Sequence, residues 1–160
     1  MNEHQLAITS GQEIPCMLLP MIDHNLLVPT TSVAEMSSVQ PLEAVDDAPE
    51  WFMGMYNWRG LKVPVVSFEA INGGQTVLNP DGRIAVLNNT GVNQSLQFIA
   101  IHTQGIPRMA RISDEDISED DGAERRPFDL MAVKVGMEEF CIPDITAMEV
   151  AYTNLMDSPS

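Results

Sequence analysis

The chain has 160 residues, which suits one domain or two small subdomains that share a core. It is 44% hydrophobic, too apolar for a disordered chain, and its 23 acidic against 8 basic residues give a formal net charge of −15. Charge of this sign repels phosphate, so it disfavours nucleic acid and anionic membrane as partners and leaves a basic protein partner, or solubility alone, as its explanation.

The N-terminal residues predict no targeting segment. Residues 1–11, which we expect to be a flexible tail, have neither the basic nor the apolar region of a signal peptide. No apolar run approaches the roughly 20 residues that cross a bilayer, so we expect no membrane insertion. Cys16 and Cys141 lie in apolar stretches outside any Cys-x-x-Cys pair, which favours buried free thiols over a disulfide and argues against zinc. We therefore expect a cytoplasmic protein.

Most of the first half predicts short strands separated by turns. Residues 13–21 are apolar with two prolines, which suits an edge strand or a bulged strand. A turn is expected at 23–25, and 26–39 is rich in β-branched residues. Within that last segment, strand alternation predicts that Val33 and Glu35 share one face.

The middle of the chain changes character. Pro49 is placed to begin a short helix, with Asp47 or Ala48 as its N-cap and Gly54 at its end. "NWRGLKVPVVSF" then predicts a strand, a turn at Gly60 and a second strand. "INGGQTVLNPDG" is rich in turn residues and predicts a loop.

The second half predicts further strands at "RIAVLNN", "LQFIAIHT" and "QGIPRMARI", and a final hairpin from "LMAVKV" to "EFCIP". Between them, "SDEDISEDDGAERR" is a run of mostly acidic residues without a packing pattern, so we expect a solvated loop. Its oxygen ligands do not follow the register of a calcium loop, which argues against a metal site.

Apolar residues recur at helical spacing after Asp144, a good N-cap, so a terminal helix is expected, with a strand as the alternative. Residues 157–160 would be a tail. About ten short strands in two groups, with one short central helix and one C-terminal helix, predict a mainly β protein. Two small barrels or a sandwich would both fit this pattern.

No motif for catalysis is present. The sequence lacks a glycine-rich phosphate loop and a Gly-x-Ser-x-Gly elbow, and His4, His24 and His102 are scattered. We therefore expect no enzyme, no catalytic residues and no cofactor. A small hydrolase remains an alternative if His102 meets a carboxylate and a nucleophile in a pocket. A barrel for single-stranded nucleic acid is disfavoured by the charge and by the 6% aromatic content. The eleven methionines are expected mostly in the core, and exposed ones would favour protein docking.

The stretch "GMYNWRGLKVPVVSFE" resembles the signature of CheW-like domains, with Gly54, Asn57, Arg59, Gly60 and Pro64 at its fixed positions. "SVAEM" is similar to the strand that precedes it in the family, and "APEWFMG" to a short helix between the two. The resemblance spans about residues 12–156, which would form one CheW-like domain of two interleaved barrel subdomains.

Two residues and one segment depart from the family pattern. Trp58 replaces the usual leucine, Ser67 stands where aspartate is common, and an acidic segment at 113–124 takes the place of a glycine-rich stretch. These departures suggest an accessory member, similar to the small CheW-like proteins of chemosensory systems linked to type IV pili.

The resemblance implies two SH3-like five-stranded β-barrels that share a core. It also implies a non-catalytic adaptor of a two-component system, which couples the cytoplasmic tip of a chemoreceptor to the regulatory domain of a CheA-type histidine kinase. Homologous CheW-like domains are further implied partners, and a scaffold unrelated to chemotaxis is the alternative. By resemblance, a Glu35–Arg59 ion pair lies beside the receptor-binding groove, and the partner-binding residues are Val33, Glu35, Gly54, Asn57, Arg59 and Gly60.

Physical chemistry supports the same ion pair. Arg59 is flanked by large apolar residues, where its charge would be costly unless it were paired. A guanidinium can hold a carboxylate by two parallel hydrogen bonds, and Glu35 on a neighbouring strand is a plausible partner. The alternative is a purely stabilising pair that touches no partner protein.

Overall fold

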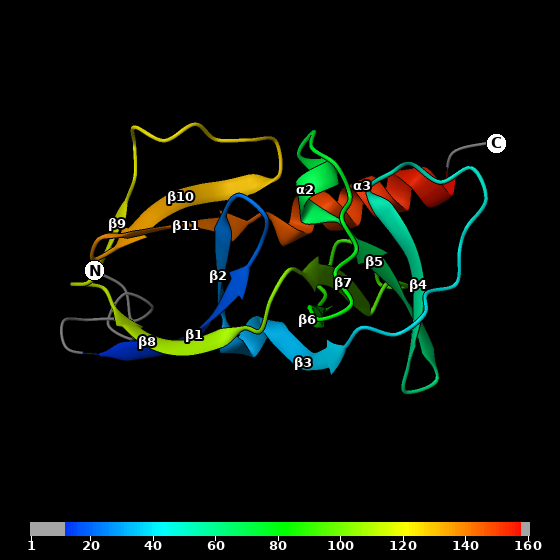
Figure 1. Cartoon of the computed structure of the whole chain (residues 1–160), viewed down its shortest axis with the longest axis horizontal. Coiled ribbons are helices and arrows are strands. Elements are labelled where there is room, and N and C mark those ends of the chain that lie inside the picture. The colour runs from blue at the N-terminus through cyan, green and yellow to red at the C-terminus, as the bar shows by residue number, and fades with distance from the viewer. Residues whose placement is uncertain (1–11, 158–160) are drawn as a thin grey trace.

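The computed structural model describes residues 12–157, and its architecture is mainly β (Figure 1). Among these residues, eleven strands form two sheets with the orders β8-β1-β2-β11-β10-β9 and β3-β6-β7-β5-β4. Figure 1 shows them side by side as a six-stranded lobe and a five-stranded lobe. The strands are β1 (Glu13–Pro20), β2 (Asn25–Pro29), β3 (Val33–Ser38), β4 (Phe52–Trp58), β5 (Leu61–Val66), β6 (Arg83–Asn88), β7 (Phe98–Thr103), β8 (Arg108–Ser113), β9 (Ile117–Glu119), β10 (Asp129–Val135) and β11 (Glu138–Pro143).

Three short helical segments accompany the sheets within the described residues: η1 (Thr30–Ser32), α2 (Phe68–Ile71) and α3 (Ile145–Asp157). The prediction of a mainly β fold with two barrel-like lobes and a C-terminal helix is confirmed. The six-stranded lobe has one strand more than expected, because the short strand β9 forms inside the acidic segment and pairs with β10. The acidic segment is thus partly strand rather than entirely loop. The expected tails at 1–11 and 158–160 lie outside the described residues, and Asp157 belongs to α3.

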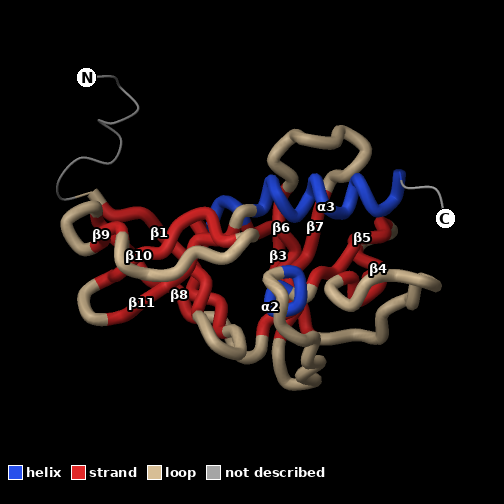
Figure 2. Tube along the Cα trace, turned by 90° about the horizontal axis from the view of Figure 1, so that it is seen from above, coloured by secondary structure: helices blue, strands red, loops and turns tan. Residues whose placement is uncertain are grey.

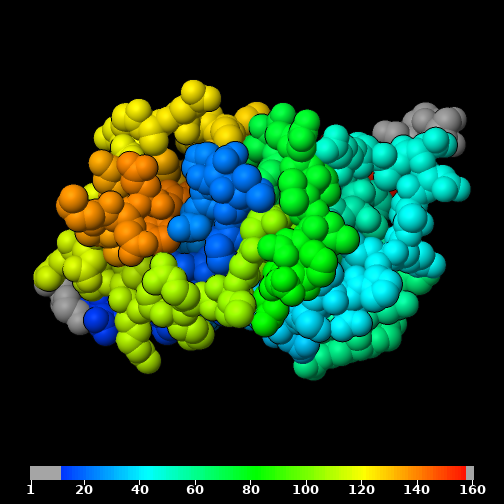
Figure 3. Space-filling view, viewed as in Figure 1, coloured from blue at the N-terminus to red at the C-terminus, as the bar shows by residue number. Residues whose placement is uncertain are grey.

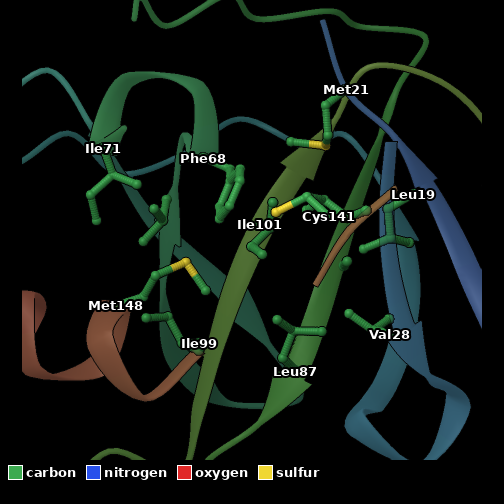
Figure 4. Packing of buried hydrophobic residues seen from close by; sticks show 13 residues of the cluster. Leu19, Met21, Val28, Phe68, Ile71, Leu87, Ile99, Ile101, Cys141 and Met148 are labelled. Atoms are coloured by element: carbon green, nitrogen blue, oxygen red, sulfur yellow. The ribbon is translucent and has the colours of Figure 1, made fainter. Parts of the chain in front are cut away.

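Three hydrophobic clusters hold the lobes together. One lies inside the six-stranded lobe and includes Leu18 and Phe140, and a second lies inside the five-stranded lobe and includes Trp58 and Val65. The third is shared, because both sheets and α3 contribute to it. Successive side chains of a strand point to opposite faces, so Val65 fills one cluster while its neighbour Val66 fills another. Figure 4 shows the shared cluster, in which Leu19, Met21, Val28, Phe68, Ile71, Leu87, Ile99, Ile101, Cys141 and Met148 meet.

The predicted helix from Pro49 to Gly54 is wrong. Phe52 N donates to Pro49 O at 3.0 Å in a turn, and strand β4 begins at Phe52. Alternate residues of β4 are buried, so period-two burial decides the conformation of this stretch. Gly54 lies within the strand, where a Cβ atom would come within 2.7 Å of Glu43 O. It therefore allows Glu43 to approach β4 closely and to pair with Met55 through two backbone hydrogen bonds.

The short central helix forms instead at α2. Ser67 is its N-cap and accepts a hydrogen bond from Ala70 N at 3.2 Å. Aspartate, which the family often has here, is an equally good N-cap, so the departure at Ser67 keeps the same local function.

Helix α3 begins where expected, because the Asp144 side chain accepts a hydrogen bond from Ala147 N at 2.9 Å. It packs against the five-stranded lobe, and the loop that joins β6 to β7 lies along it (Figure 2). The fully buried carboxylate of Glu149 accepts from the backbone N–H of Thr90 at 2.8 Å and from its hydroxyl at 3.0 Å. These bonds fix the loop to the helix. The alternative of a terminal strand is excluded.

The predicted alternation of β3 is also wrong. Val33 pairs with Leu87 and Glu35 with Val86, so a β-bulge places an extra residue between them. Leu87 belongs to the shared cluster and Val86 to the interior of the five-stranded lobe. Val33 and Glu35 therefore point to opposite faces of the sheet.

Candidate functional site

The Arg59-Gly60 pair forms the two-residue turn of the β4–β5 hairpin. Trp58 pairs with Leu61 across the turn, and the φ angles of Arg59 and Gly60 are 52° and 79°. Positive φ at both central positions defines a type I′ turn, whose backbone matches the twist of a hairpin. Glycine meets this need without strain, whereas arginine adopts the left-handed conformation at some cost. The turn thus presents a charged side chain at the tip of a rigid hairpin.

Arg59 forms an ion pair with Glu35, with Nη2 2.6 Å from Oε1. The Arg59 side chain is 70% exposed and that of Glu35 is 35% exposed. Because the Arg59 guanidinium is exposed, burial does not require it to be paired. The pair is joined by one hydrogen bond, not by the two parallel bonds that a guanidinium can form with a carboxylate. The guanidinium also lies 5.0 Å from the centre of the Trp58 ring, within reach of a cation–π interaction.

The other oxygen of Glu35 is occupied as well, because Ser37 Oγ donates to Oε2 at 3.0 Å. The hydrogen bond from Arg59 is the main reason that the pKa of Glu35 lies below its ordinary value, and the bond from Ser37 lowers it further. The carboxylate is therefore charged at neutral pH. An exposed pair of this kind contributes little to stability.

Trp58 is buried beside this pair, in the interior cluster of the five-stranded lobe. Its ring meets Phe98 edge to face, with centroids 4.7 Å apart and an interplanar angle of 72°. The indole N–H has no hydrogen-bond partner among the described residues. It nevertheless lies near enough to Glu35 to make a small contribution to the lowered pKa of that carboxyl group.

The other predicted binding residues lie apart from the pair. Val33 packs against the shared cluster, and Gly54 is buried beneath segment 42–43. Asn57 is exposed but alternates with Trp58 along β4, so it lies on the opposite face of that strand. The structure thus brings Glu35, Arg59 and Gly60 together with Trp58, which the sequence marked only as a departure.

His102 does not form a catalytic group. It is buried, its Nε2 accepts from Asn79 N at 2.9 Å, and its Nδ1 donates to Arg83 O at 3.1 Å. Burial lowers the pKa of the ring, so the imidazole is neutral. Because backbone groups occupy both nitrogens, His102 is unavailable as a base, and the alternative of a hydrolase loses its main candidate residue.

A second arginine–carboxylate pair, which the sequence analysis did not identify, lies between the lobes. Arg126 donates to Asp129 from Nε at 3.0 Å, from Nη2 at 3.1 Å and from its backbone N–H at 2.9 Å. Asn72 Nδ2 and Cys141 Sγ donate to the same carboxylate at 3.2 and 3.0 Å. Since Asn72 follows α2 in the five-stranded lobe, the network joins it to β10 and β11 of the six-stranded lobe.

The buried network also sets the ionisation of its members. Burial opposes the charge of Asp129, but the hydrogen bonds from Arg126 and Cys141 outweigh it and lower the pKa of this carboxyl group. Burial, followed by the nearby Asp129 carboxylate, raises the pKa of Cys141 to about 12. Cys141 is therefore a protonated donor, and both it and Cys16 are free, buried thiols.

A hollow lies beside this network, where the β1–β2 turn meets segments of the other lobe (Figure 3). Two cavities of about 450 and 490 Å³ flank Ile22, Asp23 and His24. The turn is held in place by Ile22 N, which donates to the buried Glu69 carboxylate at 3.0 Å. The Ile22 side chain remains half exposed between the two cavities.

None of the helices described in residues 12–157 has the length and apolar character needed to cross a membrane.

Comparison with known proteins places these features in a known fold. The family model of the CheW-like domain matches residues 15–149. Among solved structures, the chain is similar to the scaffolding protein TtCheW from Thermoanaerobacter tengcongensis, with a TM-score of 0.70 and 16% identity, covering 82% of this chain and 89% of that chain. At that identity the likeness establishes the fold alone. No curated protein matches the sequence.

Proposed function

Because the chain belongs to the CheW-like domain family, we propose that it is a non-catalytic cytoplasmic adaptor that couples chemoreceptors to a CheA-type histidine kinase. Its partners are the cytoplasmic tip of a receptor and the regulatory domain of the kinase, with homologous CheW-like domains as further partners. It serves as an accessory adaptor in a chemosensory system linked to type IV pili.

The exposed Arg59–Glu35 pair is the observation that carries this proposal. A charged pair that adds little stability, on a turn whose backbone disfavours arginine, is better explained by contact with a partner than by folding. Gly60 makes the turn possible, while Val33 and Gly54 hold the strands that carry the pair. Asn57 lies on the other face of β4 and contacts the partner at its margin.

An adaptor needs a second surface for its second partner. In the six-stranded lobe, Met137 is 98% exposed at the tip of the β10–β11 hairpin, and Met109 is also well exposed on β8. Methionine side chains are flexible and polarisable, which suits an adaptable protein interface. We place the kinase contact on this lobe and the receptor contact at the Arg59–Glu35 pair.

The test is binding of the full chain, at physiological salt, to a chemoreceptor cytoplasmic hairpin and to the regulatory domain of a CheA-type kinase from the same organism. Arg59→Ala should abolish receptor binding, and Met137→Ser should weaken kinase binding. Arg108→Ala is the matched control for receptor binding alone, since Arg108 is an exposed arginine paired with Glu138 at 3.6 Å in the other lobe, beside Met109 and Met137.

Each result has a clear meaning. Receptor binding that survives both Arg59→Ala and Glu35→Ala would remove the pair from the interface. A well-folded chain that binds neither partner would overturn the coupling function and favour a scaffold for another system.

A further inference from the structure

The six-stranded lobe is open at the end where β1 begins. Along β1, Ile14, Cys16 and Leu18 lie two residues apart, so they share the face that lines the interior of this lobe. Cys16 and Leu18 are buried there, but Ile14 is 38% exposed. An apolar cavity of about 270 Å³ lies at this end, and most of its wall comes from Ile14, Cys16, Leu27, Ile112, Ile117 and Ile142.

This cavity suits an aliphatic side chain. Its volume is below the roughly 300–1,000 Å³ of sites that hold small molecules. Of its polar residues, Ser113 already donates its hydroxyl to Asp116 Oδ2 at 2.9 Å. Apolar contact is therefore the main interaction that the cavity offers, and apolar surface of this kind gains free energy when it is covered.

One segment outside the described residues is placed to fill the cavity. Gln12, the first described residue, itself lines the cavity, so residues 1–11 lead directly to it. Leu6 and Ile8 are apolar and two residues apart, so they share a face when the segment is extended. Ile8 lies four residues before Gln12, a span that reaches up to about 14 Å. The other such segment, residues 158–160, has no aliphatic side chain.

We propose that residues 6–8 fold back onto the six-stranded lobe and place Ile8, with Leu6 beside it, in this cavity. The segment covers the interior that Ile14 and its strand partner Ile112 leave open. Because it is tethered at Gln12, its effective concentration is high, and a modest apolar contact is enough to hold it. Glu3 is its one acidic residue, so the charge of the chain opposes its return only weakly. This closure is independent of the adaptor role.

NMR of the full chain with labelled isoleucine and leucine methyl groups tests the closure directly. We expect nuclear Overhauser effects between the methyl groups of Ile8 and those of Ile112 or Ile142. Ile8→Ser should shift the methyl signals of both cavity residues. Ala7→Ser is the matched control and should leave them in place, because Ala7 lies on the other face of an extended segment. A lack of contact between Ile8 and both cavity residues in the wild type would overturn the proposal.

The reactivity of Cys16 provides a second readout, since Cys16 lines the cavity and Cys141, in the shared cluster, is an internal reference. In the double variant Leu6→Ser, Ile8→Ser we expect N-ethylmaleimide to modify Cys16 about tenfold faster than in the wild type, because the apolar cover is lost. The rate at Cys141 should not change, and peptide mass mapping measures both.

Equal rates at Cys16 in the wild type and the double variant would contradict the closure. Protection of Cys16 that rises with protein concentration would assign the cavity to a second copy of the chain. Protection that requires the receptor hairpin or the kinase domain would assign it to a partner. Either assignment would overturn the proposal.

Discussion

Two arginine–carboxylate pairs in this molecule join the same chemical groups in different surroundings, one exposed and one buried. Arg59 and Glu35 meet at an exposed hairpin tip through one hydrogen bond, with side chains 70% and 35% exposed. Arg126 and Asp129 meet between the lobes through three hydrogen bonds, with side chains 20% and 6% exposed. Burial makes the second pair costly to break, whereas exposure makes the first pair cheap to break.

The largest effect should come from breaking the buried pair. Asp129→Ala leaves the Arg126 guanidinium partly buried without its carboxylate and removes the acceptor of Asn72 and Cys141. We expect the free energy of unfolding to fall by about 3–5 kcal/mol, measured by urea denaturation. Asp129→Asn, which fills the same space without the charge, should lose less. A loss below about 1 kcal/mol for the alanine variant would show that the pair behaves like a surface pair.

Acid should weaken the same pair in the wild type. Because the folded-state pKa of Asp129 lies below its unfolded value, the stabilisation is complete above an unfolded pKa of about 3.9 and is lost as the pH falls through the folded pKa. The effect should be smaller than that of Asp129→Ala, since a protonated carboxyl group still fills its site. Denaturation curves at pH 7 and pH 3 should differ less in Asp129→Asn than in the wild type. Equal pH dependence of the two proteins would assign the acid effect to other carboxylates.

Cys141 offers another test of the buried pair, because its thiol donates a hydrogen bond to the charged Asp129 carboxylate and belongs to the shared core. Cys141→Ala removes this bond and one buried sulfur atom, so we expect a loss of about 1–2 kcal/mol in the free energy of unfolding. Cys16→Ala is a suitable control, since Cys16 is also buried but belongs to the cluster inside the six-stranded lobe. A larger loss in the control than in Cys141→Ala would argue against an energetic role for the thiol hydrogen bond.

The smallest effect on stability should come from the exposed pair. Arg59→Asn gives the turn the Asn-Gly sequence that type I′ hairpins favour, so the gain at the backbone offsets the lost ion pair. The thermal midpoint should remain close to that of the wild type while binding of the receptor hairpin falls by about tenfold or more. Calorimetry and a binding titration on the same sample would measure both. A large fall in the thermal midpoint would make the pair structural.

The sequence predicted what local pattern controls. The β4–β5 hairpin and α3 were found because a turn sequence and a cap residue act over a few positions. The helix at Pro49 was wrong because strand pairing and the close approach of Glu43 to Gly54 override a local helix signal. The shared face of Val33 and Glu35 was wrong because a single bulge reverses alternation.

The candidate site was predicted only in part. Glu35 and Arg59 were paired through family resemblance, but the exposure of the guanidinium follows from its place on the turn, which no local pattern reveals. The network around Asp129 joins residues from three distant segments, so it appears only when the lobes are packed together. The spacing of Arg126 and Asp129, three residues apart, was the one sequence signal from which part of this network could have been predicted.

The strand order has a consequence for how the chain reaches this fold. β1 and β2 come first in the sequence, yet they lie in one sheet with β8, β10 and β11 from the far end, so the entire five-stranded lobe is inserted between two parts of the other (Figure 1). During synthesis the apolar faces of the β1–β2 hairpin stay exposed until the last third of the chain has emerged. Closing so long a loop slows folding and exposes the early strands to aggregation. We therefore expect the five-stranded lobe to nucleate folding and the six-stranded lobe to complete it.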